Sequence, residues 1–298
     1  MSDDADALLK MTQERDFWRA KFEELRPLTT LLDQSLNHVT RQFVEPDFEY
    51  VMPTLRIPDE LYDSFTMKGR AEIVNWDEFY PEKNRGLPAW LPRYHSQTPR
   101  YFSYAYVAEL IENAHARETK YYGIVDTWLY ELLDAFPIKG QSVAIMGSLF
   151  PWYEAITDAF GGTPHTFEYN TIYSDHPLVQ AIKPQDFVPG SQLFDAAISI
   201  SSFEHDGLGF YGDPIDPDGD LKAMANMRKI VKPGGLMYFC VPVGKDSIVW
   251  PMRRNYGHIR FPMMTEGWNI LDSRGHDDSH FDVPFGGHHS VWVLENAG

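Results

Sequence analysis

The chain has 298 residues, of which 43% are apolar and 14% aromatic, and its formal net charge is −17. These numbers exclude a globally disordered chain, because enough apolar side chains are present to bury a core. The acidic balance argues against a nucleic-acid partner, since such a surface repels a polyanion. No apolar run reaches about 18 residues, so no membrane partner is expected.

The N-terminus and the cysteine content both favour a cytoplasmic protein. The first ten residues carry acidic groups where a secretory signal has basic ones. The single cysteine, Cys240, cannot form an internal disulfide. It lies within the apolar run 237–241, which is typical of a buried strand.

The character of the sequence changes along the chain, and we expect two parts. Residues 1–120 are predicted to form a helical and irregular extension, and residues 121–298 an α/β domain. Residues 7–43 carry apolar side chains at alternating spacings of four and three, which is typical of a helical seam. This helix either packs on its own domain or joins copies of the chain into a homo-oligomer. The aromatic segments 75–80 and 90–94 either line a substrate pocket or serve packing.

Two helices are predicted just before the α/β pattern begins. Ser103 is a suitable N-cap for a helix that runs through Ala116. A second apolar stripe covers residues 122–136 and ends at Pro137. We expect both helices to cover one face of a sheet.

The first ligand-binding signal is a strand, a glycine turn and a helix. Residues 142–146 read as a buried strand, Gly147 and Ser148 form the turn, and a helix spans 151–160. In this layout backbone N–H groups and a helix N-terminus meet a bound nucleotide. The single glycine argues against a dinucleotide, whose pyrophosphate needs the full Gly-x-Gly-x-x-Gly pattern.

Two acidic residues follow the next predicted strands. Glu168 ends the strand 165–167, about 20 residues after Gly147, where a carboxylate accepts hydrogen bonds from ribose hydroxyls. Asp186 follows a third strand at 179–182. It is our candidate for the adenine amino group, with simple solvation of the loop as the alternative.

The clearest strand, 194–200, runs into the sequence Ser201-Ser202-Phe203-Glu204-His205. Loops after the carboxyl ends of parallel strands hold the ligands in such folds. Histidine is the residue type best suited to general-base work near neutral pH, so His205 is our candidate base, and Glu204 would orient its imidazole. The alternative for His205 is a structural role.

An aspartate-rich loop, 213–220, and a basic cluster follow. The loop either binds a divalent cation or forms a rigid turn; its glycine spacing does not fit an EF-hand, so we predict no metal site. Asp220 is predicted to be the N-cap of a helix through Val231. The cluster Arg253-Arg254, with Arg260 nearby, is large enough to hold one phosphate or carboxylate.

The remaining segments predict the far side of the sheet. Lys232-Pro233-Gly234-Gly235 is expected to turn the chain into a buried strand, 236–241. Residues 288–294 read as a closing edge strand. His276 and His280 have the spacing of a metal site on a helix, but the surrounding glycines favour a loop.

The motifs VAIMGS, FE, FDAAISISS and VKPGGLMYFCVP, in this order, resemble the four core motifs of class I methyltransferases that use S-adenosylmethionine (SAM). The stretch SSFEHDGLGFYGDPIDPDGDL, with GSLFPWYEA and EYN upstream, resembles a narrower methyltransferase-like family, catalogued as a domain of unknown function. The resemblance covers about residues 138–295.

The resemblance implies an α/β, Rossmann-like class I methyltransferase sheet with flanking helices, and SAM as the cofactor. Gly147 and Ser148 would then face the methionine part of SAM, Glu168 the ribose, and Ser201 and Ser202 the neighbourhood of the sulfonium. No substrate follows from the resemblance.

The leading functional hypothesis is O-methylation of a small polar acceptor such as a sugar or glycan hydroxyl. His205 with Glu204 motivates it, because an attacking alcohol must lose its proton. The alternative is a non-catalytic, methyltransferase-like assembly protein that acts through residues 7–43. A nicotinamide-dependent oxidoreductase is the weakest reading, given the lone glycine.

Overall fold

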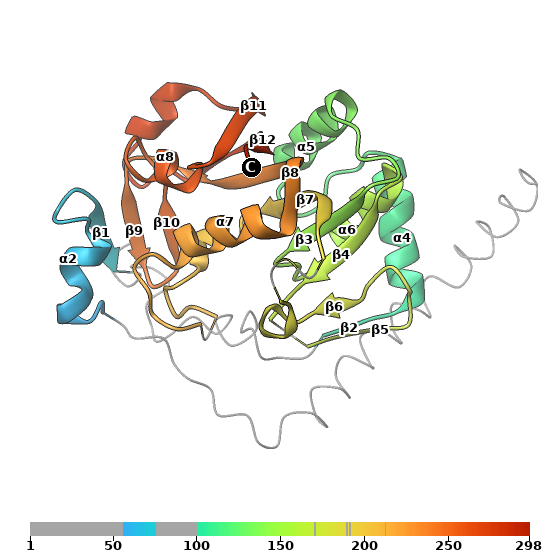
Figure 1. Cartoon of the computed structure of the whole chain (residues 1–298), viewed down its shortest axis with the longest axis horizontal. Helices are drawn as coiled ribbons and strands as arrows, with labels where there is room; N and C mark the ends of the chain where they lie inside the picture. The colour runs from blue at the N-terminus through green and yellow to red at the C-terminus, as the bar shows by residue number, and fades with distance from the viewer. Residues whose placement is uncertain (1–55, 76–99, 170, 189, 191, 212) are drawn as a thin grey trace, which may run out of the picture.

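The computed structural model describes residues 56–75 and 100–298, except residues 170, 189, 191 and 212. The predicted seam at 7–43 and the aromatic segments 76–80 and 90–94 lie outside the described residues. The centre of the fold is a seven-stranded sheet with helices on both faces (Figure 1). Its strands are β3 (Ser142–Met146), β4 (Thr163–Phe167), β6 (Ala181–Ile182), β7 (Phe194–Ile200), β8 (Val231–Val243), β11 (Trp268–Arg274) and β12 (His288–Asn296).

The strand order is β11-β12-β8-β7-β3-β4-β6. The five strands from β6 to β8 pair in parallel, whereas β12 runs antiparallel to both β8 and β11. The expectation of an edge strand at residues 288–294 is therefore wrong, because β11 covers that side. The unbroken burial from Ser290 to Leu294 agrees with an interior position, since a central strand is apolar on both faces.

Helices fill the two faces of the sheet because successive strand residues point to opposite sides. Val143 and Ile145 of β3 pack with α4, α5 and α6, and Ala144 packs on the face that carries α7 and α8. The first group of helices is seen together at one end of the view (Figure 1). Their bounds are α4 (Tyr104–His115), α5 (Ile124–Ala135), α6 (Trp152–Ala159), α7 (Gly219–Ile230) and α8 (Arg260–Met264).

The local signals for the first helices and strand are confirmed. Ser103 caps α4, and its hydroxyl accepts a hydrogen bond from the Tyr106 N–H at 3.2 Å. Strand β3 has the predicted bounds, and Pro151 precedes α6 as expected. The apolar pattern is interpreted correctly here because α4 buries one side against the sheet, whereas β3 is a central strand that is apolar on both faces.

The Lys-Pro-Gly-Gly sequence forms a bulge inside β8. The pairing with β7 shifts between Phe194 and Ala196, which lie opposite Val231 and Leu236. Gly234 has a φ of +74°, in the region that favours glycine. A Cβ atom on Gly235 would lie 2.7 Å from the Asp195 carbonyl oxygen, so the strands approach closely only with glycine there.

A smaller sheet lies beside the main one. Strand β1 (Glu72–Asn75) pairs in parallel with β9 (Ser247–Trp250), and β10 (Arg253–Asn255) pairs with β9 in antiparallel fashion. With α2 (Tyr62–Phe65) it encloses a satellite core made of Ile57, Phe65, Leu208, Ile248 and Trp250. The described part of the N-terminal segment is thus packed against the domain that follows it, and the division at residue 120 stays a prediction.

A pair of short strands ties the chain together elsewhere. Strand β2 (Arg100–Phe102) pairs in parallel with β5 (Ile172–Ser174), which follows β4. Sequence patterns missed this pairing, because three residues are too few for a periodic signal. Across the described ranges, no helix is both long enough and apolar enough to cross a membrane.

Candidate functional site

A cavity of about 490 Å³ opens at the carboxyl edge of the parallel strands. Its polar lining comes from the loops after β3, β4 and β7, where ligands bind in sheets of this type. Five of the residues singled out in the sequence lie in this lining: Gly147, Glu168, Ser201, Ser202 and His205. Three others, Ser148, Asp186 and Glu204, do not. The apolar lining, which sequence reasoning missed, includes Phe167, Pro184, Phe187, Met227 and Ile230.

Gly147 brings two loops into contact beneath the cavity. Its φ is +69°, and a Cβ atom there would lie 2.3 Å from the Ser202 Oγ. Any side chain would therefore strain the backbone and displace the side chain of Ser202. The glycine at this turn is required by this close approach, independently of any ligand.

Ser148 has a different position from the one expected. Its side chain is buried, lies 2.8 Å from Glu154 Oε2 and donates to the Phe150 carbonyl at 2.8 Å. Thr166 donates to the other oxygen, Glu154 Oε1, at 2.7 Å. Burial raises the pKa of Glu154 to about 7, against the pull of these two hydroxyls. The Ser148 hydroxyl thus holds the turn to α6 and does not face the cavity.

The cavity wall is acidic. Glu168, at the end of β4, is only 6% exposed, and Asp206 and Asp213 line the opposite loop. Burial, and then the charge of Asp213, raises the pKa of Asp206 well above its usual range. Asp186 is exposed and lies outside the lining, although its neighbours Pro184 and Phe187 contribute to it. A cationic ligand is favoured by such a wall.

Ser201 is the strained residue of the site. Its φ is +53°, which is uncommon for a residue other than glycine and clusters at functional sites. The hydroxyl donates to Glu204 Oε1 and lies 3.3 Å from His289 Nε2. Glu204 itself is 1% exposed, and its second oxygen, Oε2, has no hydrogen-bond partner among the described residues. His289, on β12, was not expected here, since its strand is distant in sequence.

His205 is held in one tautomer. Its Nδ1 lies 2.5 Å from the Met252 carbonyl oxygen, which only accepts, so Nδ1 carries the proton. The free nitrogen, Nε2, lies 3.7 Å from Glu204 Oε1. The ring stacks on Phe210 and meets Tyr211 edge to face. The lone pair needed for proton abstraction is therefore on Nε2, next to a carboxylate.

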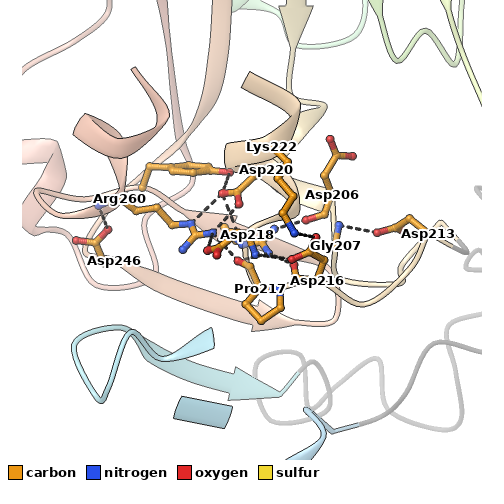
Figure 2. A network of polar contacts seen from close by, with 12 residues as sticks. Asp206, Gly207, Asp213, Asp216, Pro217, Asp218, Asp220, Lys222, Asp246 and Arg260 are labelled. Atoms are coloured by element: carbon orange, nitrogen blue, oxygen red, sulfur yellow. Dashed lines mark hydrogen bonds and ion pairs between the residues drawn. The ribbon is translucent and has the colours of Figure 1, made fainter. Parts of the chain in front are cut away.

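The aspartate-rich loop is ordered by its own side chains. Asp213 accepts hydrogen bonds from the backbone N–H groups of Gly207 at 2.6 Å, Gly209 at 3.2 Å and Tyr211 at 3.2 Å. Figure 2 shows Asp213 directed at Gly207. Within the described ranges no group of three acidic, histidine or cysteine side chains is arranged to hold a metal ion. The loop forms a rigid wall that places Tyr211 beside the cavity.

Asp220 is not an N-cap, because α7 begins one residue earlier and Asp218 precedes it. The carboxylate is fully buried and binds Arg260 through two hydrogen bonds, of 2.8 and 2.6 Å (Figure 2). The Tyr256 hydroxyl adds a third at 3.0 Å. Burial alone would raise the pKa of Asp220, but Arg254 and Arg260 hold it below its usual range.

Arg254 and Arg260 fasten the loop to the rest of the protein. Arg254 donates to the carbonyl oxygens of Asp206 at 2.5 Å, Asp216 at 3.3 Å and Pro217 at 3.2 Å. Arg260 donates to the Pro217 carbonyl at 2.6 Å. The expectation that the basic cluster as a whole holds an external anion is therefore wrong for these two arginines, which are buried and already bound.

The sheet order, the reversed strand inserted next to its edge and the cavity at the carboxyl ends define a Rossmann-like fold of the class I methyltransferase type. Residues 140–285 match the family model described as Caenorhabditis protein of unknown function, DUF268. This match agrees with the resemblance to an uncharacterised family that the motifs gave. Among curated proteins, none is similar in sequence to this chain.

Solved structures with a similar fold include several methyltransferases. The 1,6-didemethyltoxoflavin-N1-methyltransferase of Burkholderia thailandensis, crystallised with 1,6-didemethyltoxoflavin and S-adenosylhomocysteine, is 14% identical, with a TM-score of 0.42; 83% of this chain and 94% of that chain are covered. The N-methyltransferase NodS of Bradyrhizobium japonicum is 13% identical, with a TM-score of 0.38 and coverage of 64% and 98%. The CcbJ methyltransferase of Streptomyces caelestis is 12% identical, with a TM-score of 0.37 and coverage of 57% and 88%.

Proposed function

We propose that this protein is a SAM-dependent methyltransferase that methylates a hydroxyl group of a small polar acceptor, such as a sugar or glycan. The observation that carries the proposal is the cavity at the carboxyl edge of β3, β4 and β7, with a buried carboxylate on one side and a histidine on the other. Its volume of about 490 Å³ lies within the range of roughly 300–1,000 Å³ that is usual for small-ligand pockets.

The lining suits SAM in chemistry as well as in size. All four of the following residues line the cavity: Glu168 would accept hydrogen bonds from the ribose hydroxyls, and Phe187, Met227 and Ile230 would give apolar surface to the adenine. The carboxylates of Glu168 and Asp213 complement a positively charged ligand. When bound, SAM supplies an electrophilic methyl group on its sulfonium.

The proton of the acceptor hydroxyl would pass to His205. Its Nε2 carries the lone pair, because Nδ1–H is committed to the Met252 carbonyl. As Nε2 gains the proton, the ring becomes an imidazolium, and the charge of Glu204 at 3.7 Å stabilises it. Tyr211 and Phe210 pack on the ring and restrict its rotation.

Calorimetric titration with SAM and with its demethylated product tests the cofactor. We expect micromolar binding to the wild-type protein, followed by methyl transfer in a screen of sugars and nucleotide sugars. A folded sample that binds neither compound would refute the enzyme and favour the alternative, an assembly protein acting through residues 7–43.

His205→Ala tests the general base. We expect turnover to fall by about 10²- to 10⁴-fold, the usual contribution of such a base, with SAM affinity unchanged. His258→Ala is the matched control, because that histidine is 60% exposed and pairs with Asp282 away from the cavity lining. Wild-type turnover in His205→Ala would show that His205 is not the general base.

A further inference from the structure

Among the described residues, Arg253 has no hydrogen-bond or ion-pair partner, and it lies beside the candidate catalytic histidine. It begins β10 and directly follows Met252, whose carbonyl oxygen holds His205. Neighbouring residues of a strand point to opposite sides. Arg254 points to the buried Asp220, whereas Arg253 is directed to the other side of the same strand.

The guanidinium of Arg253 makes no hydrogen bond and no ion pair with the part of the chain that the structure describes, and its Nε is buried without an acceptor. This is unexpected in a chain with 43 acidic and 26 basic residues. Other arginines are satisfied: Arg117 binds Asp134, and Arg274 binds Glu131. Arg253 as a whole is half-buried, but a buried N–H donor without an acceptor is costly, so its Nε–H calls for an acceptor from outside these residues.

Arg253 is not part of the cavity lining, but its surroundings relate it to a residue that is. Gly287 makes room for it, since a Cβ atom there would lie 3.0 Å from Arg253 Nη1. Burial, and to a smaller degree the charge of Arg253, lowers the pKa of His289. His289 in turn lies 3.3 Å from the hydroxyl of Ser201, which lines the cavity. Arg253 is therefore linked to the cavity through two side chains, His289 and then Ser201, on the side of His205.

We propose that Arg253 binds an anionic group, a carboxylate or a phosphate, of the methyl acceptor. A guanidinium presents two parallel N–H donors that match the two oxygens of such a group. The cavity lining itself carries the carboxylates of Glu168 and Asp213, which repel an anion. The acceptor can therefore enter in one orientation, with its anion at Arg253 and its hydroxyl toward His205. This inference rests on the proposed function in one respect only, namely that the bound anion belongs to the methyl acceptor.

Binding of simple anions tests the site without catalysis. The Arg253 Nε–H signal, identified by its loss in Arg253→Gln, is followed by NMR during titration with inorganic phosphate and, separately, with benzoate. We expect a saturable shift with at least one anion, and the anion that binds more tightly indicates a phosphate or a carboxylate. The Nε–H signal of Arg274, which is already paired, is the control. No saturable shift at Arg253, or equal shifts at both arginines, would overturn the proposal.

Matched acceptors then test specificity. Methyl transfer is measured with glucose 6-phosphate against glucose, and with 4-hydroxybenzoate against its methyl ester. We expect the wild type to use the anionic member of a pair, and Arg253→Gln to raise its KM by roughly 10- to 100-fold, the size of a charge-assisted contact, with kcat little changed. Arg253→Lys keeps the positive charge but loses the two parallel N–H donors, so its KM should lie between those of the wild type and Arg253→Gln.

The two sets of outcomes separate this inference from the proposed function. Saturable anion binding at Arg253 in a protein that does not bind SAM would support the anion site and refute the proposed methyltransferase function. Two results would refute the anion site and support the methyltransferase function. One is methyl transfer that prefers neutral acceptors; the other is an unchanged KM for the anionic acceptor in Arg253→Gln, in a variant whose melting temperature is also unchanged.

Discussion

Glu154→Gln is the sharpest test of the electrostatics beneath the cavity. The Ser148 hydroxyl has one hydrogen, yet it lies at hydrogen-bond distance from two acceptors, Glu154 Oε2 and the Phe150 carbonyl oxygen. A protonated Glu154 resolves this, because its own O–H then donates to Ser148, and Ser148 donates to Phe150. Thr166 donates to the remaining oxygen. The geometry thus agrees with the raised pKa of Glu154 and favours a neutral carboxyl.

The expected magnitude follows from linkage. The pKa of Glu154 is about 7 in the folded protein, against its ordinary value of 4.5. Between these values the folded state holds a proton that the unfolded state releases, so stability is complete below pH 4.5 and is lost as pH rises to about 7. At about 1.4 kcal/mol for each pH unit, the loss amounts to ~3 kcal/mol. Glutamine keeps the shape of the neutral acid and does not titrate.

Urea unfolding of wild type and Glu154→Gln between pH 5 and pH 8 measures this effect. We expect similar stability at pH 5 and a variant that is more stable by ~3 kcal/mol at pH 8. Glu131→Gln, on the exposed side of α5, is the control and should show a difference that does not depend on pH. A Glu154→Gln difference that is constant across this range would show that Glu154 is ionised in the fold and would refute the reasoning.

Two further predictions concern the loop and the glycine turn. Asp220→Asn leaves two buried arginines facing a neutral amide, so we expect the free energy of unfolding, measured in urea, to fall by about 3–5 kcal/mol. Asp218→Asn is the control: its side chain is 60% exposed, and the free energy should change by less than about 0.5 kcal/mol. A loss below about 1 kcal/mol for Asp220→Asn would contradict the network in Figure 2. Gly147→Ala places a Cβ atom 2.3 Å from Ser202 Oγ and should weaken SAM binding at least about tenfold by calorimetry. Gly140→Ala is the control, because Gly140 has a similar φ of +75° but a Cβ atom there would meet nothing, so this variant should keep wild-type affinity for SAM. An equal loss of SAM affinity in Gly147→Ala and Gly140→Ala would mean that backbone strain alone is responsible.

The sequence was sufficient for features that depend on neighbouring residues. The bounds of β3, the Ser103 cap and the placement of Gly147 and Glu168 at strand ends all follow from local patterns. Strands that alternate with helices also predict a parallel sheet, and parallel strands bring their carboxyl ends to one edge. For this reason Gly147, Glu168 and Ser202 could be expected to meet although they are far apart in the chain.

Features that depend on distant partners could not be read in the same way. Asp220 precedes a run of helix-forming residues, so it looks like a cap; only the fold reveals that Arg254 and Arg260 converge on it. The contact of His289 with Ser201 requires β12 to run antiparallel beside β8, which no local pattern specifies. The side chain of Ser148 was also misplaced, because its partner Glu154 lies six residues further on, in the first turn of α6, and is buried by the fold.

The way in which the two buried arginines hold the loop after β7 has a consequence for its evolution. Arg254 and Arg260 grip it through the carbonyl oxygens of residues 206, 216 and 217, atoms that every amino acid provides. The hydrogen bonds that hold this loop therefore do not depend on which side chains its exposed residues carry. Pro214, which is exposed and lines the cavity, is free to diverge while the wall keeps its shape. Paralogues with new acceptor preferences could arise by substitutions in this one loop, without a compensating change elsewhere in the protein.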